Sequence, residues 1–352
     1  MSGGQGSLPV ISTIPDPETF YTPSVSVDGW STDGFEFLQD DSEYVDEDGN
    51  LVEVASEYSS SVSPSIYDHE FKHGRRYHSY KSGRYPVPND QYQQQLEELK
   101  HHIAFELMGG LLFSSEIDTR PRKILDIGTG AVADRYPGAS IIGTDLSPIQ
   151  PTWAPPNLEM FVDDCEDDEW LDGSGFDLVH LRDVDGFLRN PGAVIAQAYK
   201  SGGWIEFQDC IPIPYCDDDS MKDDDPLKRF SELVKEGMHK LGCTLHGSPR
   251  SKESLEEAGF TNVQLTVKKV PIGAWPQDEK LRCVGLLMSS YVSGCLGGYA
   301  AKPFEALKIS PAEREALIRQ VTTSLEDRRI HRYARYSICY GQKESRAMDL
   351  RE

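Results

Sequence analysis

A strand, glycine turn, helix and strand near the middle of the chain constrain the fold more than any other feature. The apolar run 123–127 predicts a buried strand, and a tight glycine turn follows at 128–130. A helix after the turn and a second strand at 140–144 complete the unit, which ends at Asp145. Glycine lets the backbone approach a ligand closely, and a carboxylate in that place can accept both hydroxyls of a ribose. The unit therefore predicts a ribose-containing ligand at the carboxyl ends of parallel strands.

The alternation of strands and helices continues after this unit. Further strands are expected at 158–162, 176–181 and 204–208, with a helix at 191–199 between the last two. This order is typical of a doubly wound α/β sheet. One long amphipathic helix is expected before it, at 90–111. The rest of the chain predicts helices at 226–241, 251–258, 278–288 and 310–328, strands at 263–267 and 333–340, and a small-residue turn at 291–298 that could line a pocket.

Charge divides the chain into a tail and a domain. Lys and Arg number 35 against 58 Asp and Glu, a net charge of −23, which argues against a dedicated nucleic-acid or anionic-membrane binder. No basic residue precedes Lys72, and the first 71 residues carry −15. Because residues 1–64 have few apolar clusters, they are expected to form a disordered acidic tail. The folded domain is then expected at 65–343, with cap segments at about 211–250 and 271–310 and a C-terminal tail at 344–352.

The same composition gives an expected location. No apolar run approaches the ~20 residues that span a bilayer, and no secretory signal is expected at residues 1–15. The seven cysteines are odd in number and contain no Cys-x-x-Cys pair. A reduced intracellular compartment fits this usage. The expectation is therefore the cytoplasm, with the nucleus as the alternative.

Several strings together resemble one family, the fungal LaeA-like methyltransferases, which are class I enzymes that use S-adenosylmethionine. The resemblance spans roughly 65–342. It implies a Rossmann-like, mostly parallel seven-stranded sheet that ends in an antiparallel pair of strands, with an N-terminal helix and a helical cap. The strings that carry it are Asp126-Ile-Gly-Thr-Gly, Gly143-Thr-Asp-Leu-Ser-Pro-Ile-Gln-Pro, Phe176-Asp-Leu-Val-His-Leu-Arg and Gly202-Gly-Trp-Ile-Glu-Phe-Gln-Asp, with Gly74-Arg-Arg-Tyr-His-Ser-Tyr and Tyr85-Pro-Val-Pro-Asn-Asp upstream.

Carried onto the matching positions, the resemblance implies contacts to each part of S-adenosylmethionine. The glycine turn and the acid before it would lie against the methionine part, Asp145 would hold the ribose, and Leu146 would lie on the adenine. His180 is the first candidate for a catalytic base and Glu206 the second; no metal ligand is expected. The cofactor-binding candidates are Tyr77, Tyr80, Asp126, Gly128, Gly130, Asp145, Leu146, Asp164, Cys165 and Arg182.

The chain departs from this family at two places. About six residues of the usual glycine turn and its helix are missing after Gly130, so only 11 residues connect the two strands and the helix between them is expected to have about two turns. A second, shorter gap follows Tyr199, where Lys200–Gly203 replaces a longer turn. The gaps leave open a misassigned exon end and a protein that has lost tight cofactor binding.

Other interpretations of the same residues stay open. A nicotinamide cofactor would need a third glycine where Ala133 stands. The acids at 217–219 and 223–225 could hold a metal ion but lack the spacing of an EF-hand. His180 could be a buried structural residue, Arg182 could pair with Asp183 or Asp185, and Tyr77 and Tyr80 could pack against the first long helix. At the level of function, a methyltransferase with a small-molecule acceptor competes with a nuclear regulatory protein that has protein partners, and with a pseudoenzyme.

Overall fold

A single sheet of seven strands organises the domain. The computed structural model describes residues 68–117, 120–128, 132–149, 154–170, 173–243, 245 and 249–344. The sheet has the order β5-β4-β3-β6-β7-β9-β8; the first five strands are parallel, and β9 is antiparallel to both of its neighbours. Its strands are β3 (Lys123–Ile127), β4 (Ser140–Asp145), β5 (Leu158–Val162), β6 (Phe176–Arg182), β7 (Gly202–Tyr215), β8 (Thr261–Pro271) and β9 (Tyr333–Gln342). The expected seven-stranded, mostly parallel sheet is confirmed.

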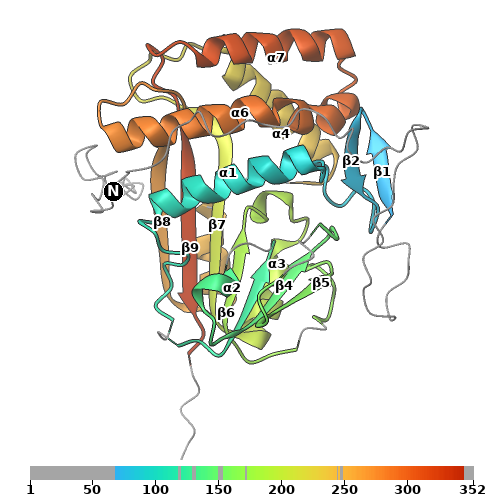
Figure 1. Ribbon diagram of the computed structural model, residues 1–352, viewed down its shortest axis with the longest axis vertical. Coiled ribbons are helices and arrows are strands. Elements are labelled where there is room, and N and C mark those ends of the chain that lie inside the picture. Colours follow the sequence, from blue (N-terminus) through green and yellow to red (C-terminus); the bar gives the residue numbers. More distant parts are fainter. Residues whose placement is uncertain are drawn as a thin grey trace, which may run out of the picture. The chain divides into compact units, whose positions relative to one another are not determined.

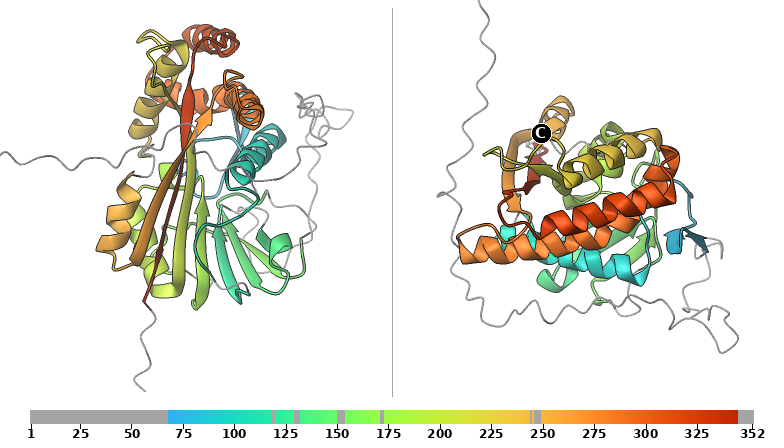
Figure 2. Two further views of the ribbon diagram at one scale, coloured as in Figure 1. Left: turned by 90° about the vertical axis from the view of Figure 1, so that its left-hand side faces the viewer. Right: turned by 90° about the horizontal axis from the view of Figure 1, so that it is seen from above.

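Helices occupy both faces of the sheet and one of its ends. α3 and α5 pack on one face, where Val194, Ile195 and Leu255 join the apolar side chains of β6 and β7. The long helices α1, α6 and α7 run side by side at the end of the sheet, together with α4 (Figures 1 and 2). The helices are α1 (Gln91–Leu107), α2 (Val132–Arg135), α3 (Pro191–Ser201), α4 (Pro226–Lys240), α5 (Pro249–Glu257), α6 (Glu279–Ala306) and α7 (Pro311–Leu325), with a 3₁₀ turn η5 (Asp185–Phe187).

Polar caps and an apolar stripe set the ends and the direction of α1. The Asp90 side chain accepts a hydrogen bond from the Gln93 N–H and so caps the helix, while two glycines follow its C-cap at Met108. Leu96, Leu99 and Ile103 are buried against α6. A two-stranded hairpin, β1 (His69–Lys72) with β2 (Arg75–His78), precedes the helix. The sequence indicated the helix but gave no sign of the hairpin.

The expected turn at 291–298 is wrong, because α6 runs through it without a break. Its small residues serve close packing instead of a change of direction. A Cβ atom on Gly294 would lie 2.5 Å from a methyl group of Leu96, and one on Gly285 would lie 2.2 Å from the Gly273 carbonyl oxygen. Both positions admit no side chain, so glycine there lets α6 approach α1 and the end of β8 closely.

Two further expectations concern length. The helix after the glycine turn, α2, is described from Val132 to Arg135; the three residues before it lie outside the described residues, so its expected two turns stay a prediction. An 18-residue window within α6 has a mean hydropathy of 1.2 and few charges, so by length and composition it could cross a membrane. More than half of that window is buried within the protein, which is typical of a core helix.

Candidate functional site

A cavity of about 840 Å³ opens at the carboxyl ends of the parallel strands. Its floor is the segments that follow β3, β4, β5 and β6, and its opposite wall is α1 with the chain just before it. It includes the point between β3 and β6 at which the strand order reverses, where doubly wound sheets bind their ligands. The sequence prediction that a ligand binds at these strand ends therefore has a matching hollow.

Gly128 begins the floor of the cavity, directly after β3. Its φ is +75°, and a Cβ atom there would lie 2.8 Å from a methyl group of Val184 and 3.2 Å from the Arg182 carbonyl oxygen. The position therefore accepts no side chain, and the bare backbone is what a ligand would meet. Thr129, Gly130 and Ala131 lie outside the described residues, so the prediction for Gly130 stays a prediction.

Asp145 ends β4, and its carboxylate lines the cavity. Its Oδ1 accepts the Ser147 N–H at 2.8 Å, and among the described residues no Lys, Arg or His lies within ion-pair distance of it. Burial, and to a smaller extent the negative charge of Glu97, raise the pKa of Asp145 to about 6. A half-buried carboxylate with spare lone pairs suits a diol that enters the cavity.

The residues next to Asp145 fit the other parts of S-adenosylmethionine. Leu146, Pro155 and Met160 give the cavity apolar walls on the side of β4 and β5, which suits an adenine ring. Asp163, Asp164 and Cys165 also line the cavity on that side. Burial raises the pKa of the Cys165 thiol to about 12, so it is neutral at physiological pH and supplies no nucleophile. A carboxylate, a glycine backbone and an apolar slot together fit the cofactor that the resemblance implies.

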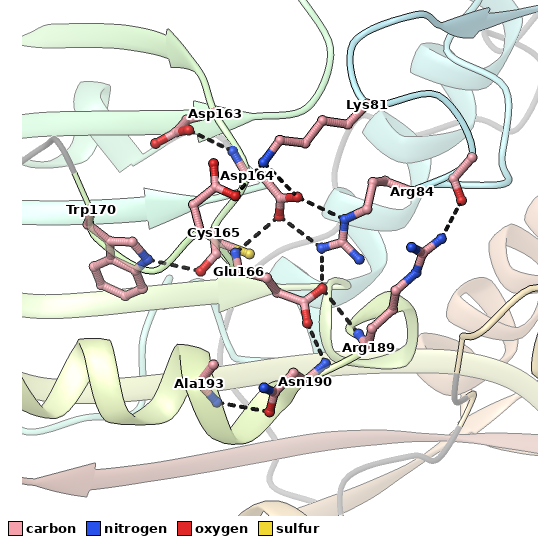
Figure 3. A network of polar contacts seen from close by, with 12 residues as sticks. Lys81, Arg84, Asp163, Asp164, Cys165, Glu166, Trp170, Arg189, Asn190 and Ala193 are labelled. Atoms are coloured by element: carbon pink, nitrogen blue, oxygen red, sulfur yellow. Dashed lines mark hydrogen bonds and ion pairs between the residues drawn. The ribbon is translucent and has the colours of Figure 1, made fainter.

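A network of charges closes the rim beside Asp164 (Figure 3). Arg84 donates to both oxygens of Asp164, at 2.8 and 2.9 Å, and also contacts Glu166. Lys81 lies 3.3 Å from Asp164 and also pairs with Asp167. Burial alone would raise the pKa of Asp164, but the hydrogen bonds from Arg84 and the Glu166 N–H lower it to about 2. The chain before α1 is thereby fastened to the loop after β5.

Arg182 reaches the cavity from the end of β6. It does not pair with Asp183 or Asp185; Nη1 instead donates to His101 Nδ1 at 2.7 Å and Nε to Gln208 at 3.2 Å. Burial and the charge of Arg182 lower the pKa of His101 to about 4. Since Arg is always protonated, His101 accepts through Nδ1 and carries its hydrogen on Nε2. His101 is therefore neutral and acts as a donor, not a base, toward the cavity.

The two candidate bases lie away from the cavity. His180 and Glu206 are paired neighbours on β6 and β7, each at most 1 % exposed, and neither lines the cavity. His180 Nδ1 lies 2.7 Å from Asp126 Oδ1, and Asp126 is equally buried on β3. Glu206 accepts the N–H groups of Ser114 and Ser115.

Depth along the strands explains this arrangement. His180 stands two residues before Arg182 and Asp126 one residue before Ile127, the first positions of their strands that line the cavity. The segment 112–115 covers them, with the Phe113 ring 4.8 Å from the His180 ring. The geometry matches the alternative in which His180 is a buried structural residue. It supports neither side chain as a base for a ligand in this cavity.

The expected tyrosines do not line the cavity either. Tyr77 is fully buried, with the ammonium group of Lys302 3.9 Å from the centre of its ring, and Tyr80 stands beside Lys81 outside the lining. Tyr85 lines the cavity in their place, with its ring 4.6 Å from that of Phe187. The string Tyr85-Pro was noted in the sequence, but its tyrosine was not singled out.

One whole wall was missed because its residues are polar. Gln93, Glu97 and His101 are four residues apart on α1, so they form one stripe on the helix, and all three line the cavity. A polar stripe on an amphipathic helix usually faces water, so the pattern alone does not indicate the wall of a cavity. The position of α1 in the chain could have indicated this wall, because the helix directly precedes the first strand of the sheet.

The acidic clusters at 217–219 and 223–225 have structural partners. Asp217 accepts a hydrogen bond from the Tyr333 hydroxyl and pairs with Lys269, and Asp218 pairs with His331. Asp225 caps α4 and pairs with the buried Arg332. Within the described ranges, no group of three or more His, Cys, Asp or Glu side chains is arranged to hold a metal ion. The seven cysteines are all free.

Comparison with known proteins points to one family. A family model described as a methyltransferase domain matches residues 99–265. Methyltransferase pytC of Aspergillus terreus is 34 % identical over 295 residues, which cover 81 % of this chain and 91 % of that protein. The secondary metabolism regulator LAE1 of Cochliobolus heterostrophus is 28 % identical over 294 residues, 77 % of this chain and 93 % of that protein.

A solved structure was also found. Phosphoethanolamine N-methyltransferase 2 of Haemonchus contortus, in complex with S-adenosyl-L-methionine, is 14 % identical with a TM-score of 0.39. The match covers 72 % of this chain and 53 % of that chain.

Proposed function

Because this chain belongs to the fungal LaeA-like class I methyltransferases, which depend on S-adenosylmethionine, we propose that it methylates a small-molecule acceptor in fungal secondary metabolism. This proposal has three further parts: the class of the acceptor, the location of the protein in the cytoplasm, and the roles of the residues named below. Methyltransferase pytC, which this chain resembles over most of its length, supports the enzymatic reading.

The observation that carries the proposal is a cavity lined by six of the ten candidate cofactor residues: Gly128, Asp145, Leu146, Asp164, Cys165 and Arg182. Its volume of about 840 Å³ lies within the range of ~300–1,000 Å³ that small-molecule sites occupy. Gly128, Asp145 and Leu146 line one part of it, and Tyr85, Phe187 and the polar stripe of α1 line another. A hollow with a nucleoside-binding part and a second, partly aromatic part suits a cofactor and a small acceptor bound together.

The chain's own residues would act mainly by holding and orienting. S-adenosylmethionine, when bound, supplies an electrophilic methyl group. Asp145 would accept the ribose hydroxyls, Leu146 and its apolar neighbours would hold the adenine, and the Arg84–Asp164 contact would close the rim. Alignment of the reactants in this way supplies much of the rate of such a transfer. No base is assigned, because both candidate bases are buried away from the cavity.

A second function is favoured by a different observation. The first 71 residues carry −15, and only 11 residues, 129–139, lie between Gly128 and β4. An acidic tail and a shortened cofactor turn suit a nuclear regulatory protein with protein partners, such as the regulator LAE1 is named to be, or a pseudoenzyme. In that case methyl transfer to small molecules is not the main role. Neither nucleic acid nor a membrane is proposed as a partner.

Transfer of a labelled methyl group separates these functions. The full chain would be incubated with S-adenosylmethionine labelled in its methyl group, together with either the low-mass fraction or the protein fraction of a fungal culture. Label in the low-mass fraction supports the proposal. Label confined to protein, or binding of the cofactor without any transfer, would reject it in favour of the second function.

A further inference from the structure

The wall of the cavity formed by α1 carries a carboxylate that the cofactor assignment does not use. Glu97 lines the cavity, and its Oε1 accepts a hydrogen bond from the Gln93 amide at 2.7 Å. No Lys or Arg within the described residues lies within ion-pair distance of it. Burial raises the pKa of Glu97, and the positive charge of Lys100 offsets this only in part. A partly buried carboxylate with no cation in ion-pair contact favours a positive ligand.

Most of the other carboxylates that line the cavity have a partner or an assigned role. Asp164 is held by Arg84 and Lys81, and Asp183 pairs with Lys100 at 2.7 Å and accepts the Cys210 N–H at 3.0 Å. Asp145 is the carboxylate assigned to the ribose. Two more line the cavity: Asp163, which accepts the Asp164 N–H, and Glu98, which is exposed. Glu97 differs from Asp164 and Asp183 in having no cation within ion-pair distance among the described residues, and from Glu98 in being partly buried.

Aromatic rings line the same cavity as Glu97. Tyr85 and Phe187 line the cavity with their rings in an edge-to-face contact, and the Tyr299 ring continues this row behind Phe187 at 6.4 Å. Burial, and then neighbouring groups that include Glu97, raise the pKa of Tyr85 well above its ordinary value, so its phenol stays neutral. A carboxylate beside aromatic rings is the chemistry that recognises a cation with organic substituents.

The position of Glu97 selects which cation this is. Glu97 lines the cavity from α1, whereas Asp145 and Asp183 line it from the ends of β4 and β6, so Glu97 lies on the wall opposite these two strand ends. In S-adenosylmethionine the sulfonium is joined to the ribose through a single carbon atom, so it must lie close to the group that holds the ribose. With the ribose on Asp145, the sulfonium falls within the region that Glu97 faces.

We propose that Glu97, with Tyr85 and Phe187, forms a sulfonium-recognition site that makes this cavity prefer the charged cofactor to its neutral product. The inference rests on the proposed function, since it requires S-adenosylmethionine in the cavity. The reaction removes the positive charge from the sulfur, so the product S-adenosylhomocysteine loses the attraction of Glu97. The product then dissociates more readily, and a new cofactor molecule replaces it.

The test compares two ligands that differ by one methyl group and one charge. S-adenosylmethionine and S-adenosylhomocysteine would be titrated calorimetrically into the full chain and into Glu97→Gln. Gln is nearly isosteric and can keep the Gln93 contact, so the expected loss is about tenfold in affinity for S-adenosylmethionine and less than about twofold for S-adenosylhomocysteine. The control is Glu106→Gln, which removes the same charge from an exposed position of α1 outside the cavity lining and should change neither affinity.

Each outcome has one meaning. An equal change, or none, in the two affinities of Glu97→Gln would overturn the inference while leaving the proposed function intact. If the unsubstituted chain binds neither ligand, the proposed function itself fails.

A measurement on the unsubstituted chain guards against a variant that does not fold. Sinefungin carries an ammonium group where the cofactor has its sulfonium, so it should bind at least threefold more tightly than S-adenosylhomocysteine. If S-adenosylhomocysteine, which is uncharged at its sulfur, binds as tightly as both charged ligands, the inference is contradicted without any substitution.

Discussion

Two groups of residues lie on or directly after the neighbouring parallel strands β3, β4, β6 and β7, and they differ in their access to the cavity. Gly128, Asp145 and Arg182 lie at the strand ends and line it. Asp126, His180 and Glu206 lie deeper in the sheet and bond to one another's strands or to the segment 112–115. Both groups contain the residue types that enzymes use. The comparison teaches that the depth of a residue along its strand, more than its type, decides whether it can meet a ligand.

The largest expected effect separates the two groups through affinity. Asp145→Ala removes the carboxylate that we propose holds the ribose hydroxyls, and hydrogen bonds to a charged group are worth about 1.5–3 kcal/mol. The affinity for S-adenosylmethionine should therefore fall about 10- to 150-fold, as measured by calorimetry. Thermal unfolding of the variant without ligand checks that it is folded. Unchanged affinity in a folded variant would refute the assignment of Asp145.

The deeper group should respond in the opposite way. His180→Ala leaves Asp126 without its imidazole contact in a buried place, which should cost about 1–3 kcal/mol in the free energy of unfolding. The affinity of the folded variant for S-adenosylhomocysteine should stay within about twofold. Denaturant unfolding and calorimetry measure the two quantities on one preparation. A stable variant with strongly reduced affinity would place His180 in the site after all.

The Arg84–Asp164 contact at the edge of the cavity belongs to neither group. Its loss should have a smaller effect, on both the free energy of unfolding and the rate of ligand release. Arg84→Gln leaves Asp164 with Lys81 as its remaining cation, so we expect a loss of about 1 kcal/mol in unfolding free energy and faster release of S-adenosylhomocysteine. Stopped-flow displacement measures the release rate. Above pH 4, Asp164 is ionised in both the folded and the unfolded chain, because contacts lower its folded pKa to about 2. The stabilisation by this pair should therefore be lost only as the pH falls from about 4 through 2.

The smallest expected effect is that of deleting the acidic tail, which belongs to neither group of residues. Residues 1–67 lie outside the described residues, and their composition predicts that they do not pack on the domain. Deletion of residues 1–64 should leave the midpoint of thermal unfolding within about 2 °C of the full chain. A drop of several degrees would show that the tail contributes to the folded domain.

The sequence predicted the sheet well because its strands carry strong local signals. Short apolar runs bounded by glycine or acidic residues became β3, β4, β5 and β6 with ends that differ by at most one residue from the expected ones. The small-residue run in α6 was misread because glycine in a helix that packs closely on another has the same letters as glycine in a turn. Only the tertiary contact of Gly294 with Leu96 distinguishes the two.

The site was predictable where function depends on the end of a strand, as for Gly128, Asp145 and Arg182. It was not predictable where function depends on which part of the fold covers which residue. His180 and Glu206 are covered by a segment some 65 to 95 residues earlier in the chain, and Glu97 and His101 face the cavity because α1 crosses the strand ends. No periodicity within one element contains that information.

Binding of S-adenosylmethionine at two pH values tests the central claim most directly, because it probes both the cavity and the carboxylate that organises it. The account predicts one cofactor per chain at pH 7.5. The pKa of Asp145 in the empty site is raised to about 6, so at pH 5 most molecules hold a protonated Asp145 and the affinity should fall by about tenfold. Asp145→Ala should lose most of this pH dependence. Absence of binding at pH 7.5, or binding that is equally tight at pH 5, would contradict the account.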